Sequence, residues 1–186
     1  MNREEFDSLG LAITPVRGIR SFTISAAGWL GGIVYKQDWL PGENVAHCYQ
    51  REYSPDRCTH PRKPAPLWIH NYWWGNGEHY ELNTAEQDFE RCRHGFYAYY
   101  DGSNNYGVYG DVTACVEGYG KVLVGTRGFR ATKARIVAFC FSEYVPLTLV
   151  DRVLTRYPLV GVAGTFEQLV DRFPPTGDIA TEVPND

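Results

Sequence analysis

"GFYAYYDGSNNYGVYGDVTACVEGYGKVLVGTRGFRATKARIVAFCF", residues 95–141, is the stretch that decides the fold of this protein. It is rich in aromatic and β-branched residues, which suit pleated and half-buried surfaces. Within it, Val112 and Ala114 alternate with Thr113 and Cys115, the period-two pattern of a strand with one buried face. The breaks "DGSNNYG", "EGYG" and "TRG" all have turn chemistry. The stretch therefore predicts three or four strands that pair antiparallel through short turns.

Toward the N-terminus the pattern is also extended. In "RGIRSFTI", Phe22 and Ile24 alternate with Ser21 and Thr23. The glycines of "SAAGWLGG" interrupt this run, "IVYKQDWL" resumes it, and "LPGEN" has the composition of a turn. These segments predict a hairpin, preceded by a weakly ordered lead over residues 1–11.

Toward the C-terminus the pattern becomes helical. "VPLTLVDRVLTRYP" has apolar residues at helical spacing, with Pro146 in the first turn and Pro158 at the end. "LVGVAG" predicts a short apolar strand. "TFEQLVDRF" opens with a capping box from Thr165 to Gln168 and predicts a second helix. Residues 175–186 are acidic and contain proline, which predicts a flexible tail.

These elements together predict an α+β protein. We expect a single antiparallel sheet of about five or six strands, with two short C-terminal helices packed on it. The chain of 186 residues is long enough for one full-sized core, so we expect a single domain over residues 12–174. Residues 41–94 are proline-rich and irregular, and such a long loop is uncommon unless it is functional, disordered or tied down.

The composition is that of a folded chain without a general excess of positive charge. A hydrophobic fraction of 44% and a charged fraction of 22% are those of a globular chain. With 18 basic and 22 acidic residues, the net charge of -4 gives no support for a general electrostatic grip on nucleic acid.

The expected cellular compartment follows from the N-terminal sequence, the absence of a long apolar run and the number of cysteines. "MNREEFDSLG" lacks the apolar core of a signal peptide, and no apolar run approaches the roughly 20 residues that span a bilayer. Five cysteines, an odd count, make a disulfide framework unexpected and indicate reduced thiols. We therefore expect a cytoplasmic protein that does not enter a membrane.

The irregular middle segment holds most of the residues that can bind a metal. They are His47, Cys48, Cys58, His60, Cys92 and His94. Cys58 with His60, and Cys92 with His94, form two C-x-H pairs, and residues two apart in an extended segment point to the same side. A tetrahedral zinc ion could order a loop that buries little apolar surface, with Cys48 able to replace either member of the first pair. The alternative is a set of unrelated surface histidines and loop cysteines. We interpret Cys115 and Cys140 as thiols within strands.

Five blocks follow one another along the chain: "PVRGIRSF" (15–22), "WLPGENVAHC" (39–48), "HPRKPAP" (60–66), "CRHGFYAY" (92–99) and "GTRGFRATKAR" (125–135). Their order resembles that of the RGYRxW, HxAPxxxCxCGxYA and GxRAxxA blocks of an uncharacterised family of actinobacteria and their phages. The similarity covers roughly residues 15–160. The resemblance implies no established activity, but it implies a zinc site. Position by position, it points to Cys48, His60, Cys92 and His94, with Cys58 outside the pattern.

The chain departs from this family pattern in two places. His94 stands where the family often has cysteine, which is chemically acceptable for zinc. About two dozen residues separate "PAP" from Cys92 where the family has only a few, so we interpret residues 67–90 as an insertion. The insertion could carry a contact surface, because tryptophan and tyrosine dominate interface hot spots. Its candidate partner-binding residues are Trp68, Tyr72, Trp73, Trp74 and Tyr80.

Three functions are compatible with these patterns. The first, which we favour, is a non-catalytic binding or regulatory module, a phage or host-interaction protein whose partner is a protein. The second is a hydrolase or transferase that uses a Cys/His pair or a zinc ion, with Glu78, His79 and Glu81 as acid and base. The third is a nucleic-acid-binding module, with cations and a tyrosine platform for stacked bases. Its candidate residues are Arg127, Arg130, Lys133 and Arg135, with Tyr97, Tyr99 and Tyr100.

Overall fold

The computed structural model describes residues 15–33, 37–46, 95–101 and 110–176, together with the backbone of residues 63–64 and 80–81. Eight strands of the described residues form one sheet: β1 (Val16–Ile24), β2 (Leu30–Gly32), β3 (Asp38–Trp39), β4 (Asn44–Val45), β7 (Phe96–Tyr99), β8 (Val112–Val124), β9 (Gly128–Phe141) and β10 (Gly161–Val162). Two further strands, β5 (Lys63–Pro64) and β6 (Tyr80–Glu81), pair with each other. The helices are α1 (Leu147–Arg156) and α2 (Phe166–Arg172).

The α+β class is confirmed, but the prediction of a purely antiparallel sheet of five or six strands is wrong. The sheet has eight strands within the described residues, and β10 runs parallel to β9, with Gly161 opposite Ala138. The parallel pair arises because α1 lies in the connection from β9 to β10, and a helical crossover returns the chain in the same direction. The additional strands β3 and β4 have two residues each, too few for a period-two pattern to predict.

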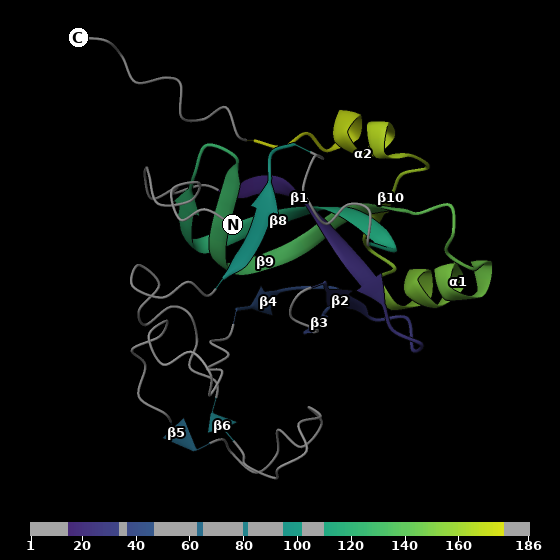
Figure 1. Ribbon diagram of the computed structural model, residues 1–186, viewed down its shortest axis with the longest axis horizontal. Helices are drawn as coiled ribbons and strands as arrows, with labels where there is room; N and C mark the ends of the chain where they lie inside the picture. Colours follow the sequence, from purple (N-terminus) through teal and green to yellow (C-terminus); the bar gives the residue numbers. More distant parts are fainter. Residues whose placement is uncertain are drawn as a thin grey trace.

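Strands β1, β8, β9 and β7 close into a ring, and Figure 1 shows β1, β8 and β9 crossing one another at its centre. β1 pairs with β8, β8 with β9 and β9 with β7, and the pair Ile19 and Tyr99 joins β7 back to β1. Closure requires strongly curved strands, and β8 and β9 are long enough to bend, at 13 and 14 residues. The sheet therefore curls into a barrel-like shape.

The predicted turn at "EGYG" is wrong, because β8 continues through it. The β8–β9 register shifts between Tyr119 and Val122, so an extra residue is accommodated there as a β-bulge. Gly120 in this bulge has φ +77°, a conformation that glycine adopts easily. A β-bulge and a turn both favour glycine, so the glycines of "EGYG" are compatible with either. The "TRG" turn is confirmed, since the N–H of Gly125 donates to the carbonyl of Gly128 at 2.8 Å.

The predicted N-terminal hairpin is present, but its second strand begins earlier than expected. β1 pairs with β2 from Ile24 opposite Leu30 to Phe22 opposite Gly32. The glycines of "WLGG" thus lie in a strand rather than in a turn. Thr23 of β1 is opposite Gly31, and its Oγ1 donates to the Gly31 carbonyl at 3.3 Å.

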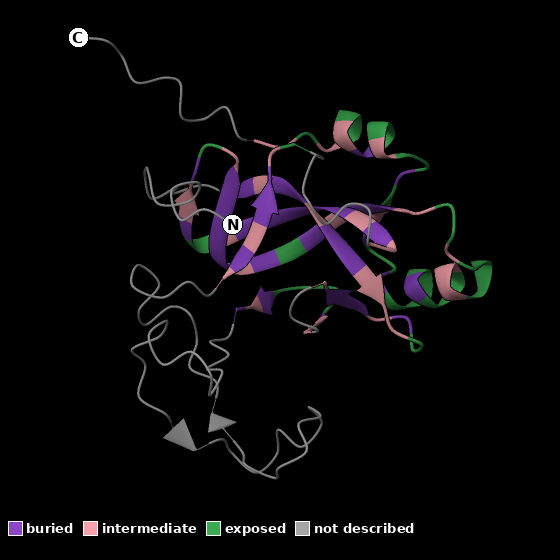
Figure 2. Ribbon diagram, viewed as in Figure 1, coloured by how far each residue is buried: buried purple, intermediate pink, exposed green. Residues whose placement is uncertain are grey.

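The core has two parts on opposite faces of β1, β8 and β9. The larger part includes the aromatic side chains of Phe22, Trp39, Phe129, Phe139 and Tyr157. The smaller part lies under α2 and includes Ile19, Cys115, Ala138, Ala163 and Leu169. Figure 2 shows the buried residues concentrated in the crossing strands, while both helices are largely exposed on their outer sides.

Both predicted helices are confirmed. α1 begins after Pro146, which is its N-cap residue, and ends before Tyr157. At α2 the capping box is present in a modified form. Thr165 Oγ1 accepts the N–H of Gln168 at 3.3 Å, and Gln168 Oε1 accepts the N–H of Gly164 at 3.0 Å. None of the helices in the described residues has the length and apolar character needed to cross a bilayer.

Candidate functional site

Most residues that the sequence selected lie outside the described part of the chain. This holds for the predicted zinc ligands Cys48, His60, Cys92 and His94, and for Trp68, Tyr72, Trp73 and Trp74 of the predicted contact surface. Of Tyr80, only the backbone is described, and it pairs with Pro64 between β6 and β5. Among the described residues, no group of three or more His, Cys, Asp or Glu side chains could hold a metal ion.

The described residues do fix where the middle segment begins and ends. On its N-terminal side, Val45 is opposite Lys133 of β9, and the N–H of Ala46 donates to the carbonyl of Thr132 at 2.8 Å. On its C-terminal side, Phe96 is opposite Ala131. β4 and β7 therefore lie along the same edge of β9 at consecutive positions. The middle segment starts and finishes at one point of the sheet, which we call the β9 junction (Ala46, Phe96, Ala131 and Thr132).

A buried cation lies close to β7. Arg20 Nη1 donates to the carbonyl of Tyr97 at 2.8 Å, and the guanidinium is 5.2 Å from the ring centre of Trp39. Arg20 Nε is buried and has no hydrogen-bond partner within the described part of the chain. Burial lowers the pKa of Arg20 to about 10, against a smaller raising effect of Tyr99, so the group stays protonated at neutral pH.

The most clearly defined polar site is a row of three charges across β1, β8 and β9. Arg17 is opposite Glu117, and Glu117 is opposite Arg135, so the three side chains share one face of the sheet. Arg17 Nε donates to Glu117 Oε1 at 3.4 Å, and Arg135 Nε donates to Glu117 Oε2 at 2.6 Å. The Glu117 side chain is 9% exposed, against 36% for Arg17 and 57% for Arg135. We call these residues the arginine row.

A second polar row follows two residues further along β8 and β9. Tyr119 is opposite Lys133, and both contact Glu43, which precedes β4. The hydroxyl of Tyr119 donates to Glu43 Oε2 at 3.2 Å, and Lys133 Nζ lies 3.6 Å from Glu43 Oε1. Burial and the neighbouring Glu43 carboxylate raise the pKa of Tyr119. The phenol is therefore a neutral donor at physiological pH.

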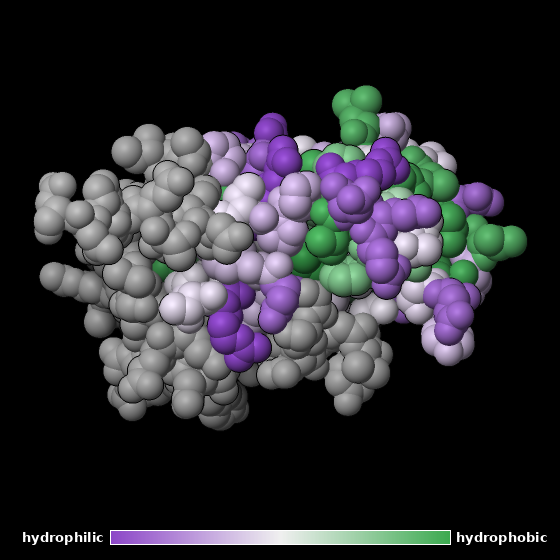
Figure 3. Space-filling view, turned by 90° about the horizontal axis from the view of Figure 1, so that it is seen from above, coloured by the Kyte–Doolittle hydropathy of each residue, from purple (hydrophilic) through white to green (hydrophobic). Residues whose placement is uncertain are grey.

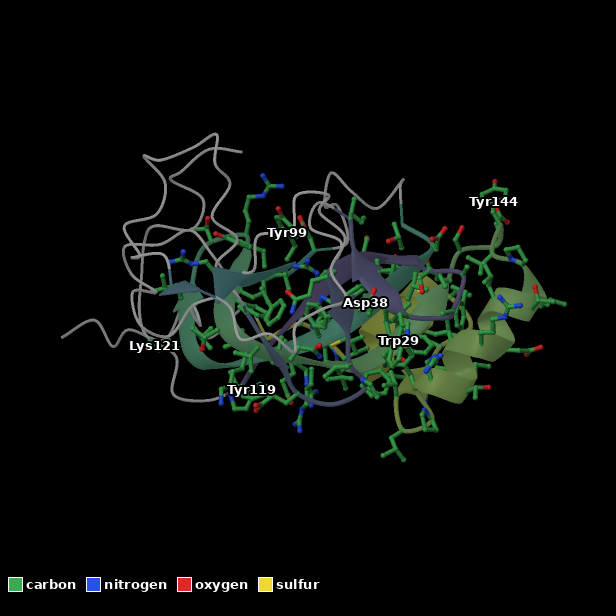
Figure 4. The ribbon with its side chains drawn as sticks, turned by 90° about the horizontal axis from the view of Figure 1, so that it is seen from below. Trp29, Asp38, Tyr99, Tyr119, Lys121 and Tyr144 are labelled. Carbon is green, nitrogen blue, oxygen red and sulfur yellow. The ribbon has the colours of Figure 1, made fainter. Side chains whose placement is uncertain are left out.

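The face of the sheet is thus divided into two halves. The apolar half, around Ile19, Cys115 and Ala138, is covered by α2, and the charged half follows directly after it. In the view from below, Tyr119 and Lys121 lie at one end of the molecule and Tyr144 lies at the other (Figure 4). The charged half is therefore well separated from the segment that leads into α1.

The residues of the nucleic-acid hypothesis do not form one exposed surface. Tyr99 and Arg130 are buried, and the hydroxyl of Tyr100 is buried as well. Lys133 and Arg135 do share the outer face of β9, but each lies against a carboxylate. A stacking platform of Tyr97, Tyr99 and Tyr100 is therefore wrong for at least Tyr99, because a base needs access to the ring face.

Cys115 and Cys140 are buried, which confirms their interpretation as thiols within strands. Burial raises the pKa of Cys115 to about 11 and also raises that of Cys140. Since the thiolate is the reactive form, neither group is a ready nucleophile at neutral pH.

Comparison with family models, with curated proteins and with solved structures finds no match in any of the three. The protein's function is therefore inferred from the geometry of this chain. The sequence did not predict the arginine row, because it indicated Arg135 only as one of four candidate cations for binding nucleic acid. Its partner Glu117 can be identified only from the β8–β9 register, and the bulge at Gly120 displaces that register.

Proposed function

We propose that this protein is a non-catalytic module that binds another protein, in a phage or host-interaction role. The observation that carries the proposal is an uneven distribution of exposed apolar side chains. Among the described residues, five of the six large exposed ones come from residues 144–162. They are Tyr144, Leu147, Leu154, Leu159 and Val162. In Figure 3 the hydrophobic side chains gather over the half of the molecule that carries the two helices.

The exposure of these side chains favours binding. Leu147 is 80% exposed and Leu159 is 96% exposed. Burying a leucine side chain is worth about 1.5–3 kcal/mol, so two of them can anchor an interface. Single exposed apolar residues are ordinary on a monomer, but several within one short segment indicate a contact surface. We call residues 144–162 the apolar segment and infer that it contacts the partner together with the insertion 67–90.

Substitution of two leucines tests the apolar segment. We expect the double variant Leu147→Glu/Leu159→Glu to lose the protein that wild type retains from a host lysate, because two charges would be buried at the interface. The matched control is Thr148→Glu, which adds a charge at an exposed position next to Leu147. Retained proteins are identified by mass spectrometry, and binding is then measured with the purified partner.

Unchanged affinity of the double variant for that purified partner would refute the role of the apolar segment. A second variant without residues 67–90 separates the contribution of the insertion. Circular dichroism spectra identical to wild type show that each variant is folded.

We further propose that a zinc ion held by Cys48, His60, Cys92 and His94 fastens the base of the middle segment. The β9 junction supports this proposal. Cys48 is two residues beyond Ala46 and His94 is two residues before Phe96, so each can lie at most about 7 Å from its anchor. When zinc is bound, it supplies order rather than chemistry, through thiolate and imidazole ligands.

Cysteine alkylation tests the zinc site, because the same chain contains both the cysteines expected to bind zinc and reference cysteines that are not. We expect a chelator to accelerate alkylation of Cys48 and Cys92 at least about tenfold, because metal-bound thiolates are shielded from reagents. Cys58, outside the ligand set, provides the reference rate. Cys115 and Cys140 report on the sheet, and they stay protected while it remains folded, since both are buried with raised pKa values. Peptide mass spectrometry measures each rate, and equal rates for Cys48 with and without chelator would exclude the site.

A further inference from the structure

The acidic segment 177–186 begins at the arginine row. Both backbone groups of Arg17 are bonded to Thr176, the last described residue. The N–H of Arg17 donates to Thr176 Oγ1 at 2.7 Å, and the N–H of Thr176 donates to the carbonyl of Arg17 at 3.2 Å. These two bonds hold Thr176 beside Arg17. The chain after Thr176 therefore begins next to Arg17.

The same bonds explain why the arginine row is compact. Since Thr176 occupies both backbone groups of Arg17, the cross-strand pair of Arg17 and Glu117 lacks backbone hydrogen bonds between its members. Side chains approach each other more closely in such pairs, with Cα atoms about 4.5 Å apart. The geometry favours the close contact between Arg17 and Glu117.

The arginine row carries one positive charge in excess. Two guanidinium groups share the single carboxylate of Glu117, and Arg17 uses only its Nε for this contact. The Nη groups of Arg17 therefore remain as donors on a side chain that is 36% exposed. A guanidinium binds a carboxylate best through two parallel N–H donors, which these groups can supply to a second carboxylate.

Segment 177–186 supplies carboxylates at matching distances. It contains Asp178, Glu182 and Asp186 and no basic residue. Asp178 is two residues beyond Thr176, within about 7 Å along the chain, and Glu182 is six residues beyond it, within about 20 Å. Arg135 lies two strands away from Arg17, at about 10 Å, so both arginines are within reach.

We propose that segment 177–186 docks in cis on the arginine row, with Asp178 bound to Arg17 and Glu182 extending over Arg135 toward the second polar row. The segment would then cover the charged half of the sheet, next to the half that α2 covers. The flexible tail expected from composition becomes an ordered strap. An acidic partner, or the phosphates of a nucleic acid, would have to displace it to reach Arg135.

Solution NMR on the full chain tests the docking. We expect backbone order parameters above about 0.6 for residues 178–182 and a fall below that value in Asp178→Asn/Glu182→Gln/Asp186→Asn. The side-chain Nε–H resonances of Arg17 and Arg135 should shift in the same variant. The Nε–H of Arg156, which donates to the carbonyl of Ala27, is the internal control and should not move. Arg135→Gln should loosen the segment, and Arg135→Lys should restore part of its order.

Charge-preserving substitutions and salt complete the experiment. Asp178→Glu/Glu182→Asp should keep the segment ordered, while 1 M NaCl, with a screening length of about 3 Å, should release it. Order parameters below about 0.6 in the wild-type chain would overturn the proposal, as would order that survives neutralisation. Order that disappears on dilution of the protein would show docking on a second copy, which also overturns docking in cis.

Discussion

Gly128→Ala is expected to cost more than about 4 kcal/mol of stability, or to prevent folding, although it adds a single methyl group. A Cβ atom at Gly128 would lie 2.1 Å from the carbonyl oxygen of Ala98 and 3.0 Å from the Cα of Tyr99. Both atoms belong to the backbone of β7, so no side chain can turn away to make room. The strand pair that closes the ring would have to separate.

Denaturation with urea measures this effect, and two glycines provide matched controls. At Gly31, also within a strand, the nearest atom to an added Cβ is Thr23 Oγ1 at 3.5 Å, and at Gly42 nothing lies within 4 Å. Gly31→Ala and Gly42→Ala should change stability by less than about 1 kcal/mol. If Gly128→Ala were as stable as these controls, the close approach of β7 and β9 would be wrong.

The same crowding explains how the ring is filled. The ring of Phe129 lies where a Cβ of Gly18 or Gly118 would be, at 2.9 and 2.2 Å. β1 and β8 thus each have a glycine facing the interior, which leaves room there for one aromatic side chain from β9. Gly18 and Phe129 are more than 100 positions apart in the sequence, so no local pattern could predict this arrangement.

The parts of the fold that follow local rules were predictable from the sequence. The hairpin at "TRG" and the capping residue Thr165 each depend on neighbouring residues, and the structure confirms both. The alternation around Val112 predicts a strand, which β8 confirms, but the second face of that strand is buried as well, since Cys115 lies under α2. The short strand predicted at "LVGVAG" is present as β10, but two-residue strands such as β4 carry no period, and the bulge at Gly120 has the composition of a turn. These features depend on tertiary pairing, so the strand number and the parallel pair could not be predicted.

The same distinction applies to the candidate sites. Cysteine and histidine spacing can predict a set of metal ligands, but only the β9 junction shows that the two ends of the middle segment meet. Arg17, Glu117 and Arg135 come from three strands, and their contact depends on two registers, one of which contains bulges. From the sequence, Arg135 could be identified only as a cation. That Glu117 is its partner follows from the β8–β9 register and not from any local pattern.

Tyr157→Phe is expected to destabilise the protein by about 2–5 kcal/mol, because it leaves two buried backbone groups without a partner, each costing about 1–3 kcal/mol. The Tyr157 hydroxyl donates to the carbonyl of Trp39 at 2.6 Å and accepts the N–H of Leu30 at 2.9 Å. One side chain after α1 thus ties β2 to β3, and its ring packs edge-on against Phe139.

Thermal and urea denaturation of Tyr157→Phe and of the control Tyr144→Phe separate this role from the loss of a hydroxyl as such. Tyr144 is 84% exposed, so its substitution should change stability by less than about 0.5 kcal/mol. Burial raises the pKa of Tyr157, so its contribution is complete below the unfolded-state value near 10 and is lost as the pH rises through the folded-state value. The difference between wild type and Tyr157→Phe should therefore be constant from pH 6 to 9 and shrink at more alkaline pH. A difference below about 0.5 kcal/mol at pH 7 would mean that the two backbone groups find other partners, and that β2 and β3 are held by packing around Trp39 alone.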